Sequence, residues 1–253
     1  MEIRVLGCYG GEAPGHRTTC FLVNSRVAID AGAVTAALSL KDQARIDAVL
    51  LTHSHLDHIR DLAFLADNIF GKRDQPVVIY GLPETIREVK AHIFNNSVWP
   101  DFTRIPSAEH PVLAYQEIRE GVAVEVEGLK VTAVKVNHTI PTAGFIVANE
   151  TKSFAFSGDT GPTEALWAEA AKRPDLAALF LETSFPSRMA GLAELTGHLT
   201  PALTRLEFAK LGRPDLPAHL YHMKPQFLKE IMGEMDDSTS TLRVARQGEH
   251  IEI

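Results

Sequence analysis

Six consecutive residues, His53-Ser54-His55-Leu56-Asp57-His58, bring three imidazoles and one carboxylate together directly after an apolar run at 48–51. Neutral imidazole nitrogen and carboxylate oxygen are ligands that zinc and the neighbouring divalent transition metals prefer. Histidines in a loop are often simply solvated, but four potential ligands in six residues are unusually dense. The hexapeptide therefore predicts a metal site on a loop that leaves the end of a strand.

The spacing of these ligands predicts two ions. His53 and His55 lie two residues apart in the loop, which lets both reach the same ion. Asp57 and His58 follow where a helix is expected to begin, so we expect them to point toward a second, adjacent ion. Ser54 lies between ligands, and we interpret it as a loop residue that packs or donates hydrogen bonds and not as a nucleophile.

Three further potential ligands, His138, Asp159 and His222, each come directly after a strand-like run. Alone, each would more often be a surface or capping residue. Because binding residues gather on loops at the ends of strands, their shared placement predicts that they converge on one cleft. The remaining histidines have no partners at ligand spacing, and we expect them at the surface or on a helix face: His16, His92, His110, His219 and His250.

The elements that must position these residues alternate along the first half of the chain. Strands are predicted at 2–8, 20–24, 26–30, 47–51 and 76–80, with a hairpin turn at Asn24-Ser25. Helices are predicted at 35–44 and 58–69, and at 84–94 after Pro83 in the first helical position. Residues 97–111 contain three prolines and are expected to form a long loop.

The second half repeats this order of strands first and helices later. Strands are predicted at 122–126, 129–136, 144–148, 154–156, 177–181 and 218–221, and helices at 162–172, 201–211 and 225–235. Two such sheets need helices over their outer faces. The pattern predicts an α/β fold with four layers in the order helix, sheet, sheet, helix.

Composition places the chain among ordinary soluble proteins, with 253 residues, 45% hydrophobic and 23% charged. The first residues lack the charged and apolar regions of a signal peptide, and no run reaches membrane-spanning length. Cys8 and Cys20 lie in apolar strand-like segments and are expected to be free thiols in a reducing, cytoplasmic setting. The net charge of −7 argues against a nucleic acid polymer as partner.

The hexapeptide, followed in order by His138, Asp159 and His222 and preceded by Asp30 in Ile29-Asp30-Ala31-Gly32, resembles the metallo-β-lactamase fold superfamily over nearly the whole chain. This resemblance implies one αββα sandwich domain spanning 1–253. It implies that His53, His55 and His138 bind one metal ion and that Asp57, His58 and His222 bind the other. Asp159 would bridge the two ions, and Asp30 would orient the ligand loop.

Three further segments resemble the class II 3′,5′-cyclic nucleotide phosphodiesterases, as does the leucine of the hexapeptide: 94–102, 181–186 and 197–201. One departure lies in Arg60-Asp61-Leu62, where the resemblance leads us to expect a glycine directly before the leucine. The resemblance implies hydrolysis of the phosphodiester of cAMP or cGMP to a 5′-monophosphate by a metal-bridging hydroxide. Two metal ions stabilise the attacking and leaving oxygens of such a displacement.

Three residues are predicted to act in catalysis. His198 precedes a proline-started helix and would contact the phosphate or protonate the leaving oxygen. Glu182 would orient His198, and Asp57 would act as a carboxylate of the metal centre. Alternatively, His198 would only form a hydrogen bond with the backbone at the start of the helix, and Glu182 would lie at the surface or pack against its neighbours.

Asn95, Asn96 and Trp99 are predicted to bind the substrate, through amide groups and through an indole on which a purine can stack. The alternative is that Asn95 and Asn96 close a helix end and that Trp99 fills the core.

The cofactors implied are two divalent metal ions, with Zn²⁺ expected and Mn²⁺ or Fe²⁺ also compatible. The partner is a small cyclic nucleotide, with no membrane, and the resemblance also implies a homodimer. Alternatives are another hydrolase of the superfamily, namely a tRNA 3′-processing nuclease, glyoxalase II or a lactonase, or a non-catalytic metal-binding scaffold. The acidic chain lacks an evident basic exosite, which argues against the nuclease.

Overall fold

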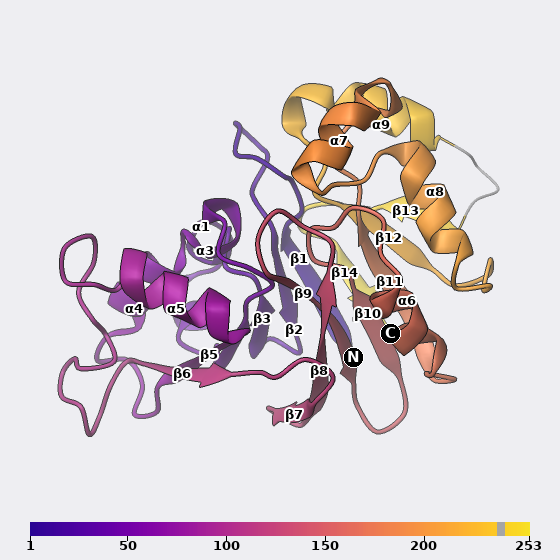
Figure 1. Ribbon diagram of the computed structural model, residues 1–253. Coiled ribbons are helices and arrows are strands. Elements are labelled where there is room, and N and C mark those ends of the chain that lie inside the picture. The colour runs from indigo at the N-terminus through magenta and orange to yellow at the C-terminus, as the bar shows by residue number, and fades with distance from the viewer. Residues whose placement is uncertain (237–240) are drawn as a thin grey trace.

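Two seven-stranded sheets face each other in the computed structural model, and helices cover their outer faces (Figure 1). The structure describes residues 1–236 and 241–253. The order helix, sheet, sheet, helix confirms the α/β sandwich that the sequence predicts.

The first sheet has the strand order β14-β1-β2-β3-β4-β5-β6. Its strands are β1 (Glu2–Gly7), β2 (Cys20–Val23), β3 (Val27–Ile29), β4 (Ala48–Leu50), β5 (Val77–Gly81), β6 (Leu113–Glu117) and β14 (His250–Glu252). The strands from β14 to β3 pair antiparallel, and those from β3 to β6 pair parallel. Asn24 and Ser25 both have positive φ, at 49° and 58°, which is the conformation of a tight hairpin turn and confirms that prediction.

The second sheet has the strand order β13-β12-β11-β10-β9-β8-β7. Its strands are β7 (Ala123–Val126), β8 (Leu129–Val136), β9 (Thr142–Ala148), β10 (Ser153–Phe156), β11 (Leu176–Glu182), β12 (Ala218–Tyr221) and β13 (Leu242–Val244). The strands from β7 to β10 pair antiparallel, and those from β10 to β13 pair parallel.

The helices divide between the two outer faces (Figure 1). The helices that cover the first sheet are α1 (Val34–Ala37), α2 (Leu40–Gln43), α3 (Leu56–Ile59), α4 (Leu62–Ile69) and α5 (Pro83–His92). The second sheet is covered by α6 (Ala165–Ala171), α8 (Pro201–Ala209) and α9 (Leu228–Met235). Between β11 and α8 lie a 3₁₀ turn (Ser187–Met189) and α7 (Ala190–Thr196), and a second 3₁₀ turn (Pro225–Phe227) leads into α9.

Aromatic side chains fill the space between the sheets. Phe21 of β2 contacts Phe156, Phe180 and Tyr221 of the opposite sheet edge to face, with ring centroids 5.2 to 5.4 Å apart. Buried aromatic pairs of this kind contribute about 0.5–1.5 kcal/mol each beyond the area they bury. This shared layer holds the two sheets, and therefore the loops at their ends, in a fixed relation.

Two predicted helices are interrupted. The helix expected over 58–69 is split between α3 and α4, because the carbonyl of His58 accepts from the amide of Ala31 and the amide of Asp61 donates to the carbonyl of Ala31. The helix expected over 35–44 is split because Ser39 is extended and caps α2, its side chain accepting from the amide of Asp42 at 3.2 Å.

Of the edge strands, β7 was predicted, whereas β6, β13 and β14 were not. β13 and β14 have only three residues each, and both form by pairing with strands distant in sequence. The C-terminal β14 pairs with β1, and the amino group of Met1 donates to the carbonyl of Ile253 at 2.7 Å, so both ends of the chain lie together (Figure 1). Within the described residues, no helix has both the length and the apolar character needed to cross a bilayer.

Candidate dinuclear metal site

The predicted ligands all follow strands of the two sheets and meet at one end of the sandwich. The hexapeptide follows β4 and enters α3, His138 follows β8, Asp159 follows β10 and His222 follows β12. Because β4 lies in one sheet and β8, β10 and β12 in the other, the ligand set spans both. The structure thus brings together every residue that the sequence predicts as a ligand.

His53, His55 and His138 form the first ligand group, with their ligand atoms within 4.8 Å of one another. Nε2 of His138 lies 3.2 Å from Nδ1 of His55. Burial lowers the pKa of His53, and the neighbouring His58 lowers it further. Burial is also the main cause of the lowered pKa of His55 and of His138. A lowered pKa favours the neutral form of each imidazole, which is the form that binds metal.

Asp57, His58 and His222 form the second ligand group, again within 4.8 Å. Oδ2 of Asp57 lies 3.3 Å from Nε2 of His222, and the Nε2 atoms of His58 and His222 are 3.1 Å apart. Burial alone would raise the pKa of Asp57, but the hydrogen bond with His222 and the charge on His58 outweigh it and lower the pKa.

Asp159 lies between the two groups. Its Oδ2 is 3.7 Å from Nε2 of His53, 3.3 Å from Nε2 of His58 and 3.2 Å from Nε2 of His222. Burial alone would raise the pKa of this carboxyl, but His222 and His58 hold it well below its ordinary value. An ionised carboxylate in contact with both groups is suited to bridge two cations.

Two buried polar atoms in this cluster have no hydrogen-bond partner within the described residues, Nε2 of His53 and Oδ1 of Asp159. Burying a polar atom without a partner costs free energy of about 1–3 kcal/mol. Nε2 of His53 lies 3.7 Å from Oδ2 of Asp159, and both unpartnered atoms are of types that bind metal. The donor set therefore fits two divalent metal ions.

One buried carboxylate, that of Asp30, orients ligands of both groups. Its Oδ2 accepts from Nδ1 of His58 at 2.7 Å, and its Oδ1 accepts from the amide of Thr52 at 2.8 Å. The Thr52 hydroxyl donates to Asp30 and lies 3.0 Å from Nδ1 of His53. Asp30 is fully buried and adopts a positive φ of 58°, a costly conformation that close packing must maintain.

Two more ligands are fixed in the same way. Nδ1 of His138 donates to the carbonyl of Gly197 at 2.9 Å, and Nδ1 of His222 lies 2.9 Å from the Ser184 hydroxyl. With Nδ1 engaged, each ring leaves Nε2 for a metal ion. Sequence reasoning missed the roles of Thr52 and Ser184. Thr52 directly precedes His53, and Ser184 lies in the segment 181–186 together with Glu182, so both are close in sequence to predicted site residues.

Gly32 lets the Asp30 loop approach α3. A Cβ on Gly32 would lie 2.1 Å from the carbonyl oxygen of Asp57, a distance that no side chain could tolerate. The glycine of the motif Ile29-Asp30-Ala31-Gly32 is thus explained by this close backbone contact.

His198 and Glu182 form a buried pair beside the ligands. Nδ1 of His198 donates to Oε1 of Glu182 at 2.7 Å, and Glu182 also accepts from the Ser184 hydroxyl at 3.0 Å. Burial alone would lower the pKa of His198, but Glu182 outweighs it and raises the pKa. The structure thus places Glu182 where the prediction requires, holding His198 by one nitrogen and leaving the other toward the cavity.

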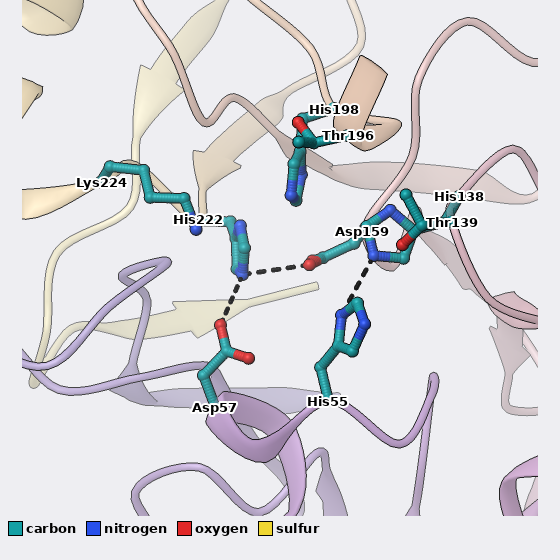
Figure 2. Close-up of a pocket in the computed structure, with 9 residues that line it drawn as sticks. All are labelled: His55, Asp57, His138, Thr139, Asp159, Thr196, His198, His222 and Lys224. Carbon is teal, nitrogen blue, oxygen red and sulfur yellow. Dashed lines mark hydrogen bonds and ion pairs between the residues drawn. The ribbon is translucent and has the colours of Figure 1, made fainter. Parts of the chain in front are cut away.

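Figure 2 shows the cavity that His198 and several of the predicted ligands line. It has a volume of about 250 Å³. Its lining residues are His55, Asp57, His138, Thr139, Asp159, Thr196, His198, His222 and Lys224. Lys224, which sequence reasoning missed, supplies an ammonium group at one end, where its Nζ donates to the carbonyl of Gly10 at 2.8 Å and lies 5.7 Å from the ring of Phe185.

The three predicted substrate-binding residues lie elsewhere, in the segment after α5. Oδ1 of Asn95 accepts from the amides of Ser97 and Val98, and Oδ1 of Asn96 accepts from the amide of Asp101. Trp99 packs on the helical side of the first sheet and contacts Phe64. None of the three is among the residues that line the cavity of Figure 2, so their role in substrate binding stays a prediction.

One non-ligand histidine departs from expectation. His219 is 8% exposed, not at the surface, and its ring stacks on Phe180 at 5.1 Å within the second sheet. Because β12 is buried along its whole length, its polar positions are buried with the apolar ones. Cys8 and Cys20 are free and buried, as expected.

Comparison with known proteins agrees with this geometry. A probable 3′,5′-cyclic-nucleotide phosphodiesterase of Yersinia pestis is 26% identical over 277 residues, covering 90% of this chain and 79% of that protein. A ribonuclease Z of a Mycobacterium species is 35% identical over 139 residues, covering 50% of this chain and 47% of that protein. The crystal structure of unliganded yeast PDE1 matches the fold with a TM-score of 0.79 at 21% identity, covering 98% of each chain.

The predicted metal ligands all fall within the segment that carries the family pattern. The sequence profile described as "Beta-lactamase superfamily domain" matches residues 25–230, which include Asp30, the hexapeptide and every ligand after it. The chain therefore belongs to the beta-lactamase superfamily domain family.

Proposed function

We propose that this metallo-β-lactamase fold hydrolase cleaves the phosphodiester of 3′,5′-cyclic nucleotides to give 5′-monophosphates, with two divalent metal ions bound. The observation that carries the proposal is the pair of ligand groups that meet at Asp159, next to the buried Glu182–His198 pair. The similarity to the Yersinia pestis phosphodiesterase over 90% of this chain supports the choice of substrate.

His53, His55 and His138 would hold one ion, Asp57, His58 and His222 the other, and Asp159 would contact both. Zn²⁺ suits this set of imidazole nitrogens and carboxylate oxygens, and Mn²⁺ or Fe²⁺ would also be accepted. When bound, a pair of such ions activates water at neutral pH and polarises a phosphoryl oxygen.

The protein's own residues would then act on the substrate in three ways. The ammonium of Lys224 attracts the negative charge of the phosphate toward its end of the cavity. Glu182 raises the pKa of His198, which favours the imidazolium form, and this imidazolium would donate a proton to the ribose 3′-oxygen as that oxygen leaves phosphorus. Asp30 keeps the ligand rings in place, which fixes where the phosphate binds.

A second candidate function is nucleolytic cleavage of RNA, favoured by the 35% identity to a ribonuclease Z over half of this chain. Both activities break a phosphodiester bond, and the ligand set serves either. The net charge of −7 favours the small substrate, because a long polyanion needs neutralising contacts over many phosphates. We also propose a cytoplasmic location, and a homodimer stays a prediction.

A substrate panel on protein of measured metal content tests the proposal. The panel contains 3′,5′-cyclic nucleotides, 2′,3′-cyclic nucleotides, precursor tRNA and a glutathione thioester. We expect turnover of the 3′,5′-cyclic nucleotides with a 5′-monophosphate as product. Hydrolysis of the precursor tRNA or the thioester alone would overturn the proposal.

A further inference from the structure

A second recess adjoins the metal cavity, and His55 lines both. Each has a volume of about 250 Å³. Binding sites for small molecules typically occupy roughly 300–1,000 Å³. Neither cavity alone reaches that range, and because His55 lines both, a ligand larger than a phosphate that is held at the metal ligands would reach the recess past this side chain.

The two sides of the recess differ in chemistry. Ile140 and Pro141, in the connection between β8 and β9, contribute apolar surface. The first turns of α5 contribute Glu84, Arg87 and Glu88. Apolar surface combined with a few polar groups suits a planar heteroaromatic ring that carries hydrogen-bonding groups at its edge.

The charges that line the two cavities differ. In the recess the two carboxylates, Glu84 and Glu88, outnumber the one guanidinium, Arg87, whereas the ammonium of Lys224 lines the metal cavity and attracts an anionic phosphate there. A carboxylate in turn accepts hydrogen bonds from N–H groups. The phosphate of a nucleotide would therefore lie among the metal ligands, and its base in the recess.

Of the two carboxylates, Glu84 has the freer oxygens. Glu88 is bonded to the guanidinium of Arg87 at 2.9 and 3.0 Å and lies 3.2 Å from Nε2 of His92. Glu84 has one ion pair, a distant one in which its Oε1 lies 3.8 Å from Nζ of Lys135, and its side chain is 33% exposed. Glu84 is the residue best placed to accept from a ligand.

We propose that this recess binds the base of the nucleotide and that Glu84 accepts hydrogen bonds from it, with a preference for guanine. Guanine carries N1–H and the N2 amino group side by side, which match the two oxygens of a carboxylate. Adenine carries an amino group next to the acceptor N1, which does not. The inference rests on the proposed function and adds to it the site and the type of base.

The first test compares kcat/KM for cGMP and cAMP in metal-loaded wild type, Glu84→Gln and Glu169→Gln. An amide can pair with adenine as well as with guanine. Glu84→Gln should therefore lower the ratio of kcat/KM for cGMP to kcat/KM for cAMP by about tenfold, which is within the range for losing a bidentate contact to a base. Glu169 lies on α6, outside both cavities, and its variant should keep the wild-type ratio. An unchanged ratio in Glu84→Gln would overturn the role of Glu84.

The second test does not need turnover. Calorimetry on the same metal-loaded proteins measures binding of 5′-GMP, 5′-AMP and ribose 5-phosphate. We expect wild type to bind 5′-GMP more tightly than ribose 5-phosphate, and Glu84→Gln to lose most of the advantage of 5′-GMP over 5′-AMP. Equal affinity of wild type for 5′-GMP and ribose 5-phosphate would rule out the base site. If the base selectivity holds while cyclic nucleotides are not hydrolysed, the proposed reaction fails and the base site stands.

Discussion

Asp30 shows how much of the metal site depends on one residue that is not itself a ligand. Its carboxylate contacts His58 directly and reaches His53 through the hydroxyl of Thr52. It therefore fixes one ligand from each group. Partners of this kind are usually worth a factor of about 10–100 in metal affinity.

Asp30→Asn keeps the size of the side chain but removes its charge. We expect metal affinity to fall by about 10–100-fold, because the amide accepts more weakly from Nδ1 of His58 and from Thr52. Competition with a chelator of known affinity measures the change. Asp175→Asn is the matched control, since Asp175 pairs with Arg173 at 2.6 Å far from the ligands. Wild-type affinity in Asp30→Asn would contradict the account.

His198 is predicted to act on the substrate and not to hold metal. His198→Ala should retain the wild-type metal content and lose about 10²–10⁴-fold in kcat on a cyclic nucleotide, the range for removing a general acid. Glu182→Gln should lower kcat in the same direction by less, because the amide still contacts Nδ1 of His198. Full activity in His198→Ala would remove this residue from the mechanism, and loss of metal from it would make it a ligand.

At the scale of elements, the pairing of α6 with α8 depends on a buried carboxylate. Glu207 is 2% exposed, and it accepts from the indole of Trp167 at 2.6 Å and from the amide of Thr163 at 3.0 Å. It also forms an ion pair of 2.7 Å with Lys210. These contacts secure α8, the helix that begins just after His198.

Glu207→Ala should lower the free energy of unfolding by about 3 kcal/mol, because it leaves the buried indole N–H and an amide without acceptors. Glu169→Ala, on the exposed side of α6, should change it by less than about 0.5 kcal/mol. Denaturant unfolding monitored by tryptophan fluorescence compares the two. Equal stability of both variants would show that the pairing contributes little.

Thiol reactivity tests the packing of the sheets. Cys8 lies in the core between the two sheets, and burial, with a smaller contribution from Glu249, raises its pKa to about 12. Because the thiolate is the reactive form, Cys8 should be inert to a thiol reagent at pH 8 in the folded protein. Cys20 is fully buried, its pKa is raised by burial, and it should behave likewise. Two thiols should react after denaturation; rapid reaction of either in the native protein would contradict the packing.

The elements that could be predicted are those that their own local sequence favours, and the others depend on contacts with distant parts of the chain. Strands β8 and β12 match the predicted limits because their apolar runs are long or bounded by turns. The split between α3 and α4 could not be predicted, since Ala31, distant in sequence, takes the hydrogen bonds that would continue the helix. Strand β6, the short edge strands β13 and β14, and helix α7 carry too little periodicity to be recognised.

At the scale of the whole molecule, the site too combines residues that local sequence patterns reveal with residues whose roles depend on contacts between distant parts of the chain. The cluster of candidate ligands could be predicted because four of them lie within six residues and the others follow strands, and strand ends of the two sheets meet at one end of the sandwich. Thr52, Ser184 and Lys224 could not, because their roles depend on contacts with residues that are distant in sequence, namely Asp30, His222 and Gly10. The segment at 95–99 forms local turns, and its role in substrate binding stays a prediction.

The most direct test of the central claim measures hydrolysis of cGMP and cAMP while Zn²⁺ is titrated into metal-free protein, with product identity read by ³¹P NMR and bound metal read by elemental analysis. The account predicts that activity rises to its maximum at two ions per chain and that the product is the 5′-monophosphate. Asp159→Ala should bind fewer ions and remain inactive. Full activity at one ion per chain, a 3′-monophosphate product, or no turnover of either nucleotide at full metal occupancy would contradict it.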